Sequence, residues 1–161
     1  MTFHLKAGVA TMVGMAGALL AGAGMAFGLT LPKIDDVATL KECGACHLVY
    51  SPQLLPQRSW DAIMAHLDTH FGEVATLDET TRLEVLAYLL ANAVDAPGSK
   101  ANSRVLRGVK ADDVPTRITT LPWWIGRHEE VNMRNLKSTA VKSAANCLGC
   151  HRTADQGVFT E

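Results

Sequence analysis

The chain has 161 residues, a length that fits one domain or two very small ones and excludes a large multi-domain enzyme. Apolar residues make up 48% of the chain and charged residues 19%, which is the composition of a folding protein and not of a disordered one. The 15 Lys and Arg residues nearly balance the 16 Asp and Glu residues, so the net charge of −1 gives no reason to expect nucleic acid as a partner.

Residues 1–31 differ in kind from the rest of the chain. Lys6 is followed by an apolar stretch rich in small residues, from Ala7 to Leu31. A short basic start, an apolar run and small residues near its end predict a signal peptide, cleaved after Ala23 or Ala26. The stretch is also long enough to be an uncleaved N-terminal membrane anchor. Both alternatives place the rest of the chain outside the cytoplasm, in the periplasm, either soluble or anchored to the inner membrane.

The remaining sequence divides into two blocks, residues 33–95 and 114–161, joined by a linker at 96–113. The linker begins with turn-forming and polar residues and continues as what we expect to be a solvated connector. No strong strand pattern is present, so the expected fold class is all-α with long irregular connections. The second block is short for a domain held by an apolar core alone, and a further stabiliser is expected.

Helix signals occur in both blocks, as capping residues followed by apolar positions at helical spacing. In chain order, the expected helices run from a cap at Asp35 or Asp36 towards Cys43, from a cap at Ser59 through Phe71 with a stop at Gly72, from a cap at Asp78 to about Ala93, from Pro122 through Trp123, Trp124 and His128, and from a cap at Ser138 to about Cys150.

Every cysteine lies in one of two Cys-x-x-Cys-His motifs, at residues 43–47 and 147–151. This motif is the attachment site of c-type haem: each sulfur adds to one haem vinyl group, and the adjacent histidine reaches the iron as the proximal ligand. The prediction is two covalently bound haem c groups. The expected attachment residues are Cys43, Cys46, Cys147 and Cys150, and the expected proximal iron ligands are His47 and His151.

Other uses of the cysteines fit less well. A structural zinc site takes four ligands in a compact arrangement, whereas these two pairs lie far apart and each carries an immediate histidine. A thioredoxin-type redox pair would need a βαβ context. Two disulfides would suit an exported protein, but a Cys-x-x-Cys disulfide closes a tiny loop and stabilises little.

Few residues outside residues 1–31 are candidates for the sixth iron position. Neither Met64 nor Met133 lies in a Pro/Gly-rich loop of the kind that carries a methionine ligand, which leaves His66, His70 and His128. On one helix through Phe71, His70 would lie closer to the apolar face than His66. We therefore expect His70 to bind iron and His66 to lie on the surface. The alternative for His70 is a partly buried histidine without a metal.

The second haem must take its sixth ligand from upstream, because only ten residues follow His151. His128 is the nearest donor; its alternative role is an ion pair with Glu129 or Glu130. We pair the ligands locally, His47 with His70 and His151 with His128, but spacing alone does not exclude the crossed pairing. The expected walls of the haem sites are the aromatic residues Trp60, Phe71, Tyr88, Trp123 and Trp124.

Several runs resemble the small di-haem cytochromes c of photosynthetic and other bacteria. The most specific are Leu-Leu-Pro-Gln-Arg-Ser-Trp at 54–60 and His-Phe-Gly-Glu at 70–73, and the resemblance covers most of residues 42–95 and 117–159. It implies bis-histidine ligation and two small haem-cored domains, the first roughly like a class I cytochrome c. It also implies a role in periplasmic electron transfer.

The resemblance further implies redox partners. Members of this family are associated with a membrane b-type cytochrome and a mono-haem oxygen-binding cytochrome of the sphaeroides haem protein type. We therefore expect a one-electron carrier and not an enzyme, with the b-type cytochrome as donor and the oxygen-binding cytochrome as acceptor. The main alternative is a di-haem enzyme with one open iron, peroxidase- or reductase-like, and a haem-based sensor is a further one.

Overall fold

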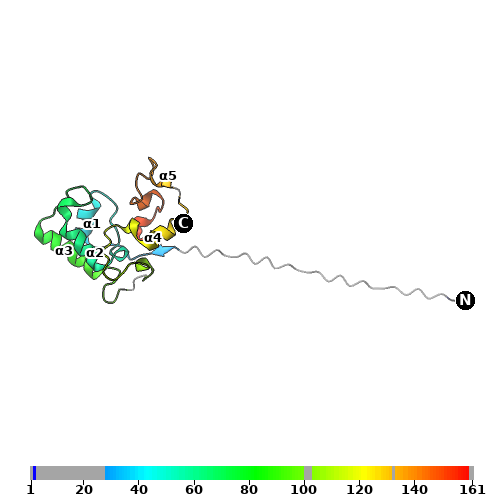
Figure 1. Ribbon diagram of the computed structural model, residues 1–161, viewed down its shortest axis with the longest axis horizontal. Helices are drawn as coiled ribbons and strands as arrows, with labels where there is room; N and C mark the ends of the chain where they lie inside the picture. Colours follow the sequence, from blue (N-terminus) through cyan, green and yellow to red (C-terminus); the bar gives the residue numbers. More distant parts are fainter. Residues whose placement is uncertain (1, 3–27, 100–102, 132, 160–161) are drawn as a thin grey trace.

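The computed structural model describes residues 2, 28–99, 103–131 and 133–159 of the chain. Almost all of the predicted signal peptide or anchor lies outside these residues. Figure 1 shows the helices gathered into one body, with α1, α2 and α3 on one side and α4 and α5 on the other. The expected all-α class is confirmed. Within the described residues no helix combines the length and the apolar character that a membrane span requires.

The described part of the chain contains five α-helices, six short 3₁₀ helices and one two-stranded sheet. The α-helices are Val37–Gly44 (α1), Gln57–Ala65 (α2), Glu79–Ala91 (α3), Pro122–Arg127 (α4) and Met133–Leu136 (α5). The 3₁₀ helices are Pro52–Leu54 (η1), Leu67–Thr69 (η2), Ser103–Leu106 (η3), Ile118–Thr120 (η4), Cys147–Gly149 (η5) and Ala154–Gln156 (η6). The strands are Leu29–Thr30 (β1) and Val158–Phe159 (β2).

Two helices begin at the caps that the sequence predicts. The carboxylate of Asp36 accepts a hydrogen bond of 2.7 Å from the backbone N–H of Thr39 at the start of α1. The carboxylate of Asp78 accepts one of 3.0 Å from the N–H of Thr81 at the start of α3. These bonds satisfy backbone donors that have no partner within the helix. α3 ends at Ala91, slightly before the predicted end.

The predicted helix from Ser59 through Phe71 is wrong at both ends. α2 begins earlier, after Pro56, and fully buries Ser59 in its first turns. It ends at Ala65 because the chain turns back to bury Leu67 and to form a 2.8 Å hydrogen bond from the N–H of Ala75 to the carbonyl of Leu67. His70 therefore follows the helix in a turn and is not part of it.

The predicted helix from Ser138 to about Cys150 does not form. The backbone makes one turn, in which the N–H of Lys142 donates to the carbonyl of Ser138, and then stops because Lys142 has a left-handed φ of 68°. The side-chain amide of Asn146 donates to the carbonyl of Val141 at 2.9 Å. The Asn146 side chain thus satisfies a carbonyl that a backbone N–H would satisfy in a helix. The second motif begins in η5 instead of in an α-helix.

One hydrophobic cluster contains residues from both blocks and from the linker. Leu55 and Val85 of the first block, Val105 of the linker and Leu121 of the second block are all at most 1% exposed and belong to this cluster. η3 packs against α4. The prediction of a solvated connector is therefore wrong, because the linker contributes apolar side chains that the short second block needs for its own core.

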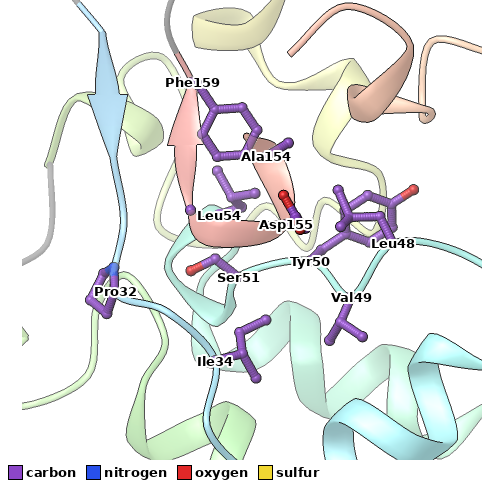
Figure 2. Close-up of a pocket in the computed structure, with 11 residues that line it drawn as sticks. Pro32, Ile34, Leu48, Val49, Tyr50, Ser51, Leu54, Ala154, Asp155 and Phe159 are labelled. Atoms are coloured by element: carbon purple, nitrogen blue, oxygen red, sulfur yellow. The ribbon is translucent and has the colours of Figure 1, made fainter. Parts of the chain in front are cut away.

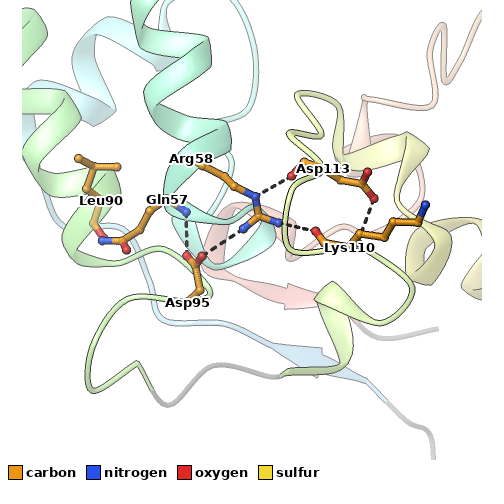
Figure 3. A network of polar contacts seen from close by, with 6 residues as sticks. All are labelled: Gln57, Arg58, Leu90, Asp95, Lys110 and Asp113. Carbon is orange, nitrogen blue, oxygen red and sulfur yellow. Dashed lines mark hydrogen bonds and ion pairs between the residues drawn. The ribbon is translucent and has the colours of Figure 1, made fainter.

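Arg58 joins the first block to the linker through a polar network (Figure 3). Its guanidinium donates to the carbonyl of Asp113 at 2.6 Å and to that of Lys110 at 3.0 Å. It also forms an ion pair of 3.5 Å with Asp95. The same Asp95 carboxylate accepts a 2.7 Å hydrogen bond from the N–H of Gln57, the first residue of α2. The network holds both ends of the linker against α2.

The two strands join the beginning and the end of the described main body. Leu29 pairs with Phe159 and Thr30 with Val158 in an antiparallel register. The N–H of Leu31 donates to the carbonyl of Gly157 at 2.8 Å, and Leu31 is only 3% exposed. Residues 29–31, which the sequence grouped with the leader, are thus part of the folded protein.

Candidate haem sites

The first motif follows directly from α1. Cys43 lies in the last turn of this helix and packs against the hydrophobic cluster, while Cys46 and His47 lie in the exposed turn that follows. None of the four cysteines, all of which lie in the described residues, is paired in a disulfide. Burial raises the pKa of the Cys43 thiol, with the neighbouring Glu42 charge as a second cause. A fixed Cys43 and an accessible Cys46 suit the attachment of a large planar group across one edge.

His70 lies opposite His47 although the two residues come from different turns. Their ring centroids are 6.2 Å apart and their planes differ by 17°. His70 is held by a turn in which the N–H of Glu73 donates to its carbonyl at 3.1 Å. The ring of Phe71 meets the His70 ring edge-on at 4.8 Å, and the guanidinium of Arg117 lies 4.3 Å from the centroid of Phe71. A residue of the second block thus supports the first site.

The second pair of candidate iron ligands consists of His128 and His151. Their ring centroids are 6.1 Å apart and their planes are nearly perpendicular, at 89°. His128 is the C-cap residue of α4, and the first turn of α4 carries Pro122, as predicted. The edge of the Phe159 ring meets His151 at a centroid distance of 5.5 Å. β2, which contains Phe159, therefore helps to form the wall of the second site.

Hydrogen bonds to backbone carbonyls fix the orientation of the His47 and His128 imidazoles. Nδ1 of His47 lies 2.6 Å from the carbonyl oxygen of Leu48, and Nδ1 of His128 lies 2.8 Å from that of Trp124. A carbonyl accepts only from a protonated nitrogen, so the lone pair in each ring is on Nε2. A histidine that binds a metal through one nitrogen donates from the other in this way.

Both pairs fit one metal ion between them. Two imidazoles on opposite sides of an ion, each with a metal–nitrogen bond of about 2.0–2.1 Å, hold their ring centroids about 6 Å apart. The observed 6.2 and 6.1 Å match this separation. Burial is the main cause that lowers the pKa of both His70 and His128, so that at pH 7 both rings are in the neutral form that binds metals.

The structure brings together the local pairs, and it places the other candidate ligands elsewhere. His66 is exposed at the end of α2. Met64 is 3% exposed within the hydrophobic cluster. Trp60 is buried there too, with its indole N–H donating to the carbonyl of Pro52 at 2.8 Å. Of the expected aromatic walls, Phe71 and Trp124 touch a candidate ligand directly.

Two aromatic residues at the sites were not identified from the sequence. Tyr50 stacks on His47 with a centroid distance of 5.0 Å, and Phe159 contacts His151. The position of Tyr50 three residues after the proximal histidine was the one local signal for its role. The role of Phe159 depends on the pairing of β2 with β1, which no nearby sequence pattern indicates.

A family profile and several solved structures are similar to this chain. A family profile described as "Dihaem cytochrome c" matches residues 39–159. The diheme cytochrome c from Rhodobacter sphaeroides is 45% identical over 80% of this chain and 100% of that chain, with a TM-score of 0.73. A second structure, of DHC purified from Rhodobacter sphaeroides, gives 41% identity over 79% and 99% of the two chains and a TM-score of 0.67.

A third solved structure comes from another genus. The diheme cytochrome type c from Shewanella baltica OS155 is 31% identical over 76% of this chain and 85% of that chain, with a TM-score of 0.62. A search of curated proteins gave no match. On the profile match and these likenesses, the chain belongs to the dihaem cytochrome c family, whose members are haem electron-transfer proteins, and it carries two covalently bound haem c groups.

Proposed function

We propose that this protein is a periplasmic one-electron carrier in which each haem iron is bound by two histidines. His47 and His70 bind the first iron, and His151 and His128 bind the second. The observation that carries the proposal is the pair of centroid separations, 6.2 and 6.1 Å, between imidazoles on opposite sides of each site. When bound, each haem takes up and releases one electron.

The histidines determine what the sites do. Two imidazoles on an iron leave no position for oxygen, peroxide or nitrite, which favours electron transfer over the enzyme alternative. Two nitrogen ligands also stabilise the oxidised iron more than a histidine and a methionine do, so both midpoint potentials should be lower than those of a His/Met cytochrome c. The backbone contacts of His47 and His128 restrain the orientation of these two rings.

The location and the partners follow from the sequence. Covalent haem attachment takes place outside the cytoplasm, and residues 1–31 have the pattern of a signal peptide or anchor. We propose a membrane b-type cytochrome as electron donor and a mono-haem oxygen-binding cytochrome as acceptor, on the resemblance to the small di-haem cytochromes c. Haem propionates add negative charge to a chain of net charge −1, so a partner with a positive patch is expected.

Ligand binding tests the closed-iron proposal. The absorption spectra of the oxidised and reduced holoprotein should be low-spin, and neither cyanide nor carbon monoxide should change them at neutral pH. Carbon monoxide binding to either reduced haem in stoichiometric amount would contradict the proposal and favour the enzyme alternative. A cytochrome whose iron is bound by a histidine and a methionine, and so also has no open position, is a suitable reference for the titration.

A separate experiment tests electron transfer to the proposed acceptor. The reduced protein should pass electrons to a mono-haem oxygen-binding cytochrome in a stopped-flow experiment, with a rate that falls as salt is added, because complementary charges accelerate encounter. Transfer that is no faster than with an unrelated cytochrome of the same charge would reject this acceptor. Haem staining of periplasmic and membrane fractions tests the location.

A further inference from the structure

Tyr50 contacts both haem motifs, and the proposed ligation does not use it. Its ring stacks on the imidazole of His47, with centroids 5.0 Å apart and 23° between the planes. Its hydroxyl donates a 2.8 Å hydrogen bond to the carbonyl of Ala145, which lies 95 residues later in the chain. The backbone N–H of Cys147 donates to the same carbonyl at 3.1 Å. One side chain thus joins the proximal histidine of the first motif to the turn that begins the second.

The surroundings of Tyr50 make this contact part of a junction between the two sites. Tyr50 lines a pocket formed by the loop after the first motif, by the chain around Pro32 and by the C-terminal tail (Figure 2). Phe159 lines the same pocket from β2 and contacts His151 edge-on at 5.5 Å. The aromatic neighbours of both proximal histidines therefore meet at this pocket.

We infer that Tyr50 is a positioning residue that sets the separation and relative orientation of the two haem groups, and so the rate of electron exchange between them. The inference rests on the proposed function, because it assumes that electrons pass between the two sites. The second haem is bonded to Cys147, and the hydrogen bond from Tyr50 holds the turn from which Cys147 follows. Electron exchange falls steeply with separation, so small displacements of this turn change the rate.

Tyr50 also acts on the first site through its stacking contact. Groups that pack against a metal-binding histidine restrain its orientation and tune the metal. Loss of the hydroxyl alone should loosen the link to the second motif but keep the ring on His47. The two functions of the side chain are therefore separable by substitution, which a general role in packing would not allow.

The experiment compares Tyr50→Phe with Tyr88→Phe in the full holoprotein. Tyr88, the other tyrosine of the chain, lies on α3 and lines a pocket with Pro32 and Asp35 whose lining includes no residue of either motif. We expect Tyr50→Phe to slow intramolecular electron exchange at least threefold in the half-reduced protein, measured by NMR exchange. The separation of the two midpoint potentials should change, and the amide of Cys147 should exchange with deuterium faster. Tyr88→Phe removes only a hydroxyl and keeps the ring that the sequence places at a haem wall, so it should leave all three quantities unchanged.

Equal exchange rates and potentials in Tyr50→Phe and the wild type would overturn the inference. That result leaves the proposed function intact if both irons stay closed to carbon monoxide, so the two failures are distinguishable. Should Tyr50→Phe not assemble, incorporation of 3-fluorotyrosine in the Tyr88→Phe background perturbs the same hydrogen bond and keeps the ring. An unchanged exchange rate there would equally overturn the inference.

Discussion

The indole of Trp124 lies parallel to the imidazole of His128, with ring centroids 4.0 Å apart and 14° between their planes. The carbonyl of Trp124 also lies 2.8 Å from Nδ1 of the same imidazole. One residue of α4 thus restrains His128 through its side chain and through its backbone. This double contact fixes a histidine that is otherwise only the C-cap of a six-residue helix.

Trp124→Leu should weaken the binding of His128 to the second iron. It removes the stacked ring but keeps the backbone carbonyl, and a stacked aromatic pair contributes about 1 kcal/mol, or about fivefold in the detachment equilibrium. In the variant, cyanide should displace His128 from the oxidised iron at a concentration about fivefold lower than any that displaces it in the wild type, as followed by absorption. Trp123→Leu is the matched control on the same helix, and an equal effect there would show that the stacking contact is not the cause.

His70→Ala should convert one haem to the high-spin state and leave the other low-spin, because only the first site loses an imidazole. His66→Ala is the matched control, because His66 is exposed and lies directly after the end of α2, four residues before His70. It should leave both haems low-spin. The absorption band of high-spin ferric haem reports the change. Two low-spin haems in the His70→Ala variant would show that His70 is not a ligand.

Electron paramagnetic resonance of the oxidised protein should resolve two different low-spin centres. The planes of His47 and His70 differ by 17°, whereas those of His128 and His151 differ by 89°. Nearly parallel imidazoles give an ordinary rhombic low-spin signal, and perpendicular ones give a strongly anisotropic signal with one large g value. The His70→Ala variant should lose the rhombic signal alone. Two identical signals in the wild type would contradict the observed ring orientations.

Arg58→Leu should lower the free energy of unfolding by about 1–2 kcal/mol. The substitution removes donors to the carbonyls of Lys110 and Asp113 and leaves Asp95 without its cation, in a partly exposed setting that screens the ion pair. Chemical denaturation of the holoprotein measures the change. Arg107→Leu replaces an exposed arginine of the same linker and should cost much less. Equal losses would mean that the network does not hold the linker to α2.

Gly157→Ala should destabilise the junction of the N-terminal strand with the C-terminal tail. Gly157 has a φ of +77°, and an added Cβ would clash with the carbonyl oxygen of Leu31. Gly98 is the matched control, because it has the same φ of +77° with open space around an added Cβ. Gly98→Ala should cost only the left-handed conformation, roughly 1–2 kcal/mol.

The difference between the two glycine variants isolates the contact with Leu31. Thermal unfolding should show a larger decrease in Tm for Gly157→Ala than for Gly98→Ala. Hydrogen exchange should also be faster at Leu31, whose N–H donates to Gly157. Equal decreases in Tm would show that the close approach of Leu31 contributes nothing to stability.

Features that depend on a few consecutive residues could be predicted from the sequence. The two Cys-x-x-Cys-His motifs identify the cofactor because thioether attachment and proximal ligation involve five consecutive residues. The cap Asp78 is confirmed, and Asp36 is the one of the two expected alternatives that caps α1, because these hydrogen bonds span only three residues. The expected helix through His70 ends at Ala65, so His70 lies opposite His47 because of a turn and not because of the apolar face of a helix.

The way in which these local units meet depends on long-range packing. The turn that brings His70 opposite His47 depends on burial of Leu67. The link from Tyr50 to Ala145 and the burial of Val105 beside Leu121 join residues far apart in the chain. Such contacts arise because each short block has too little apolar surface to form a core alone. Their free energy depends on the whole packed chain, which no local pattern encodes.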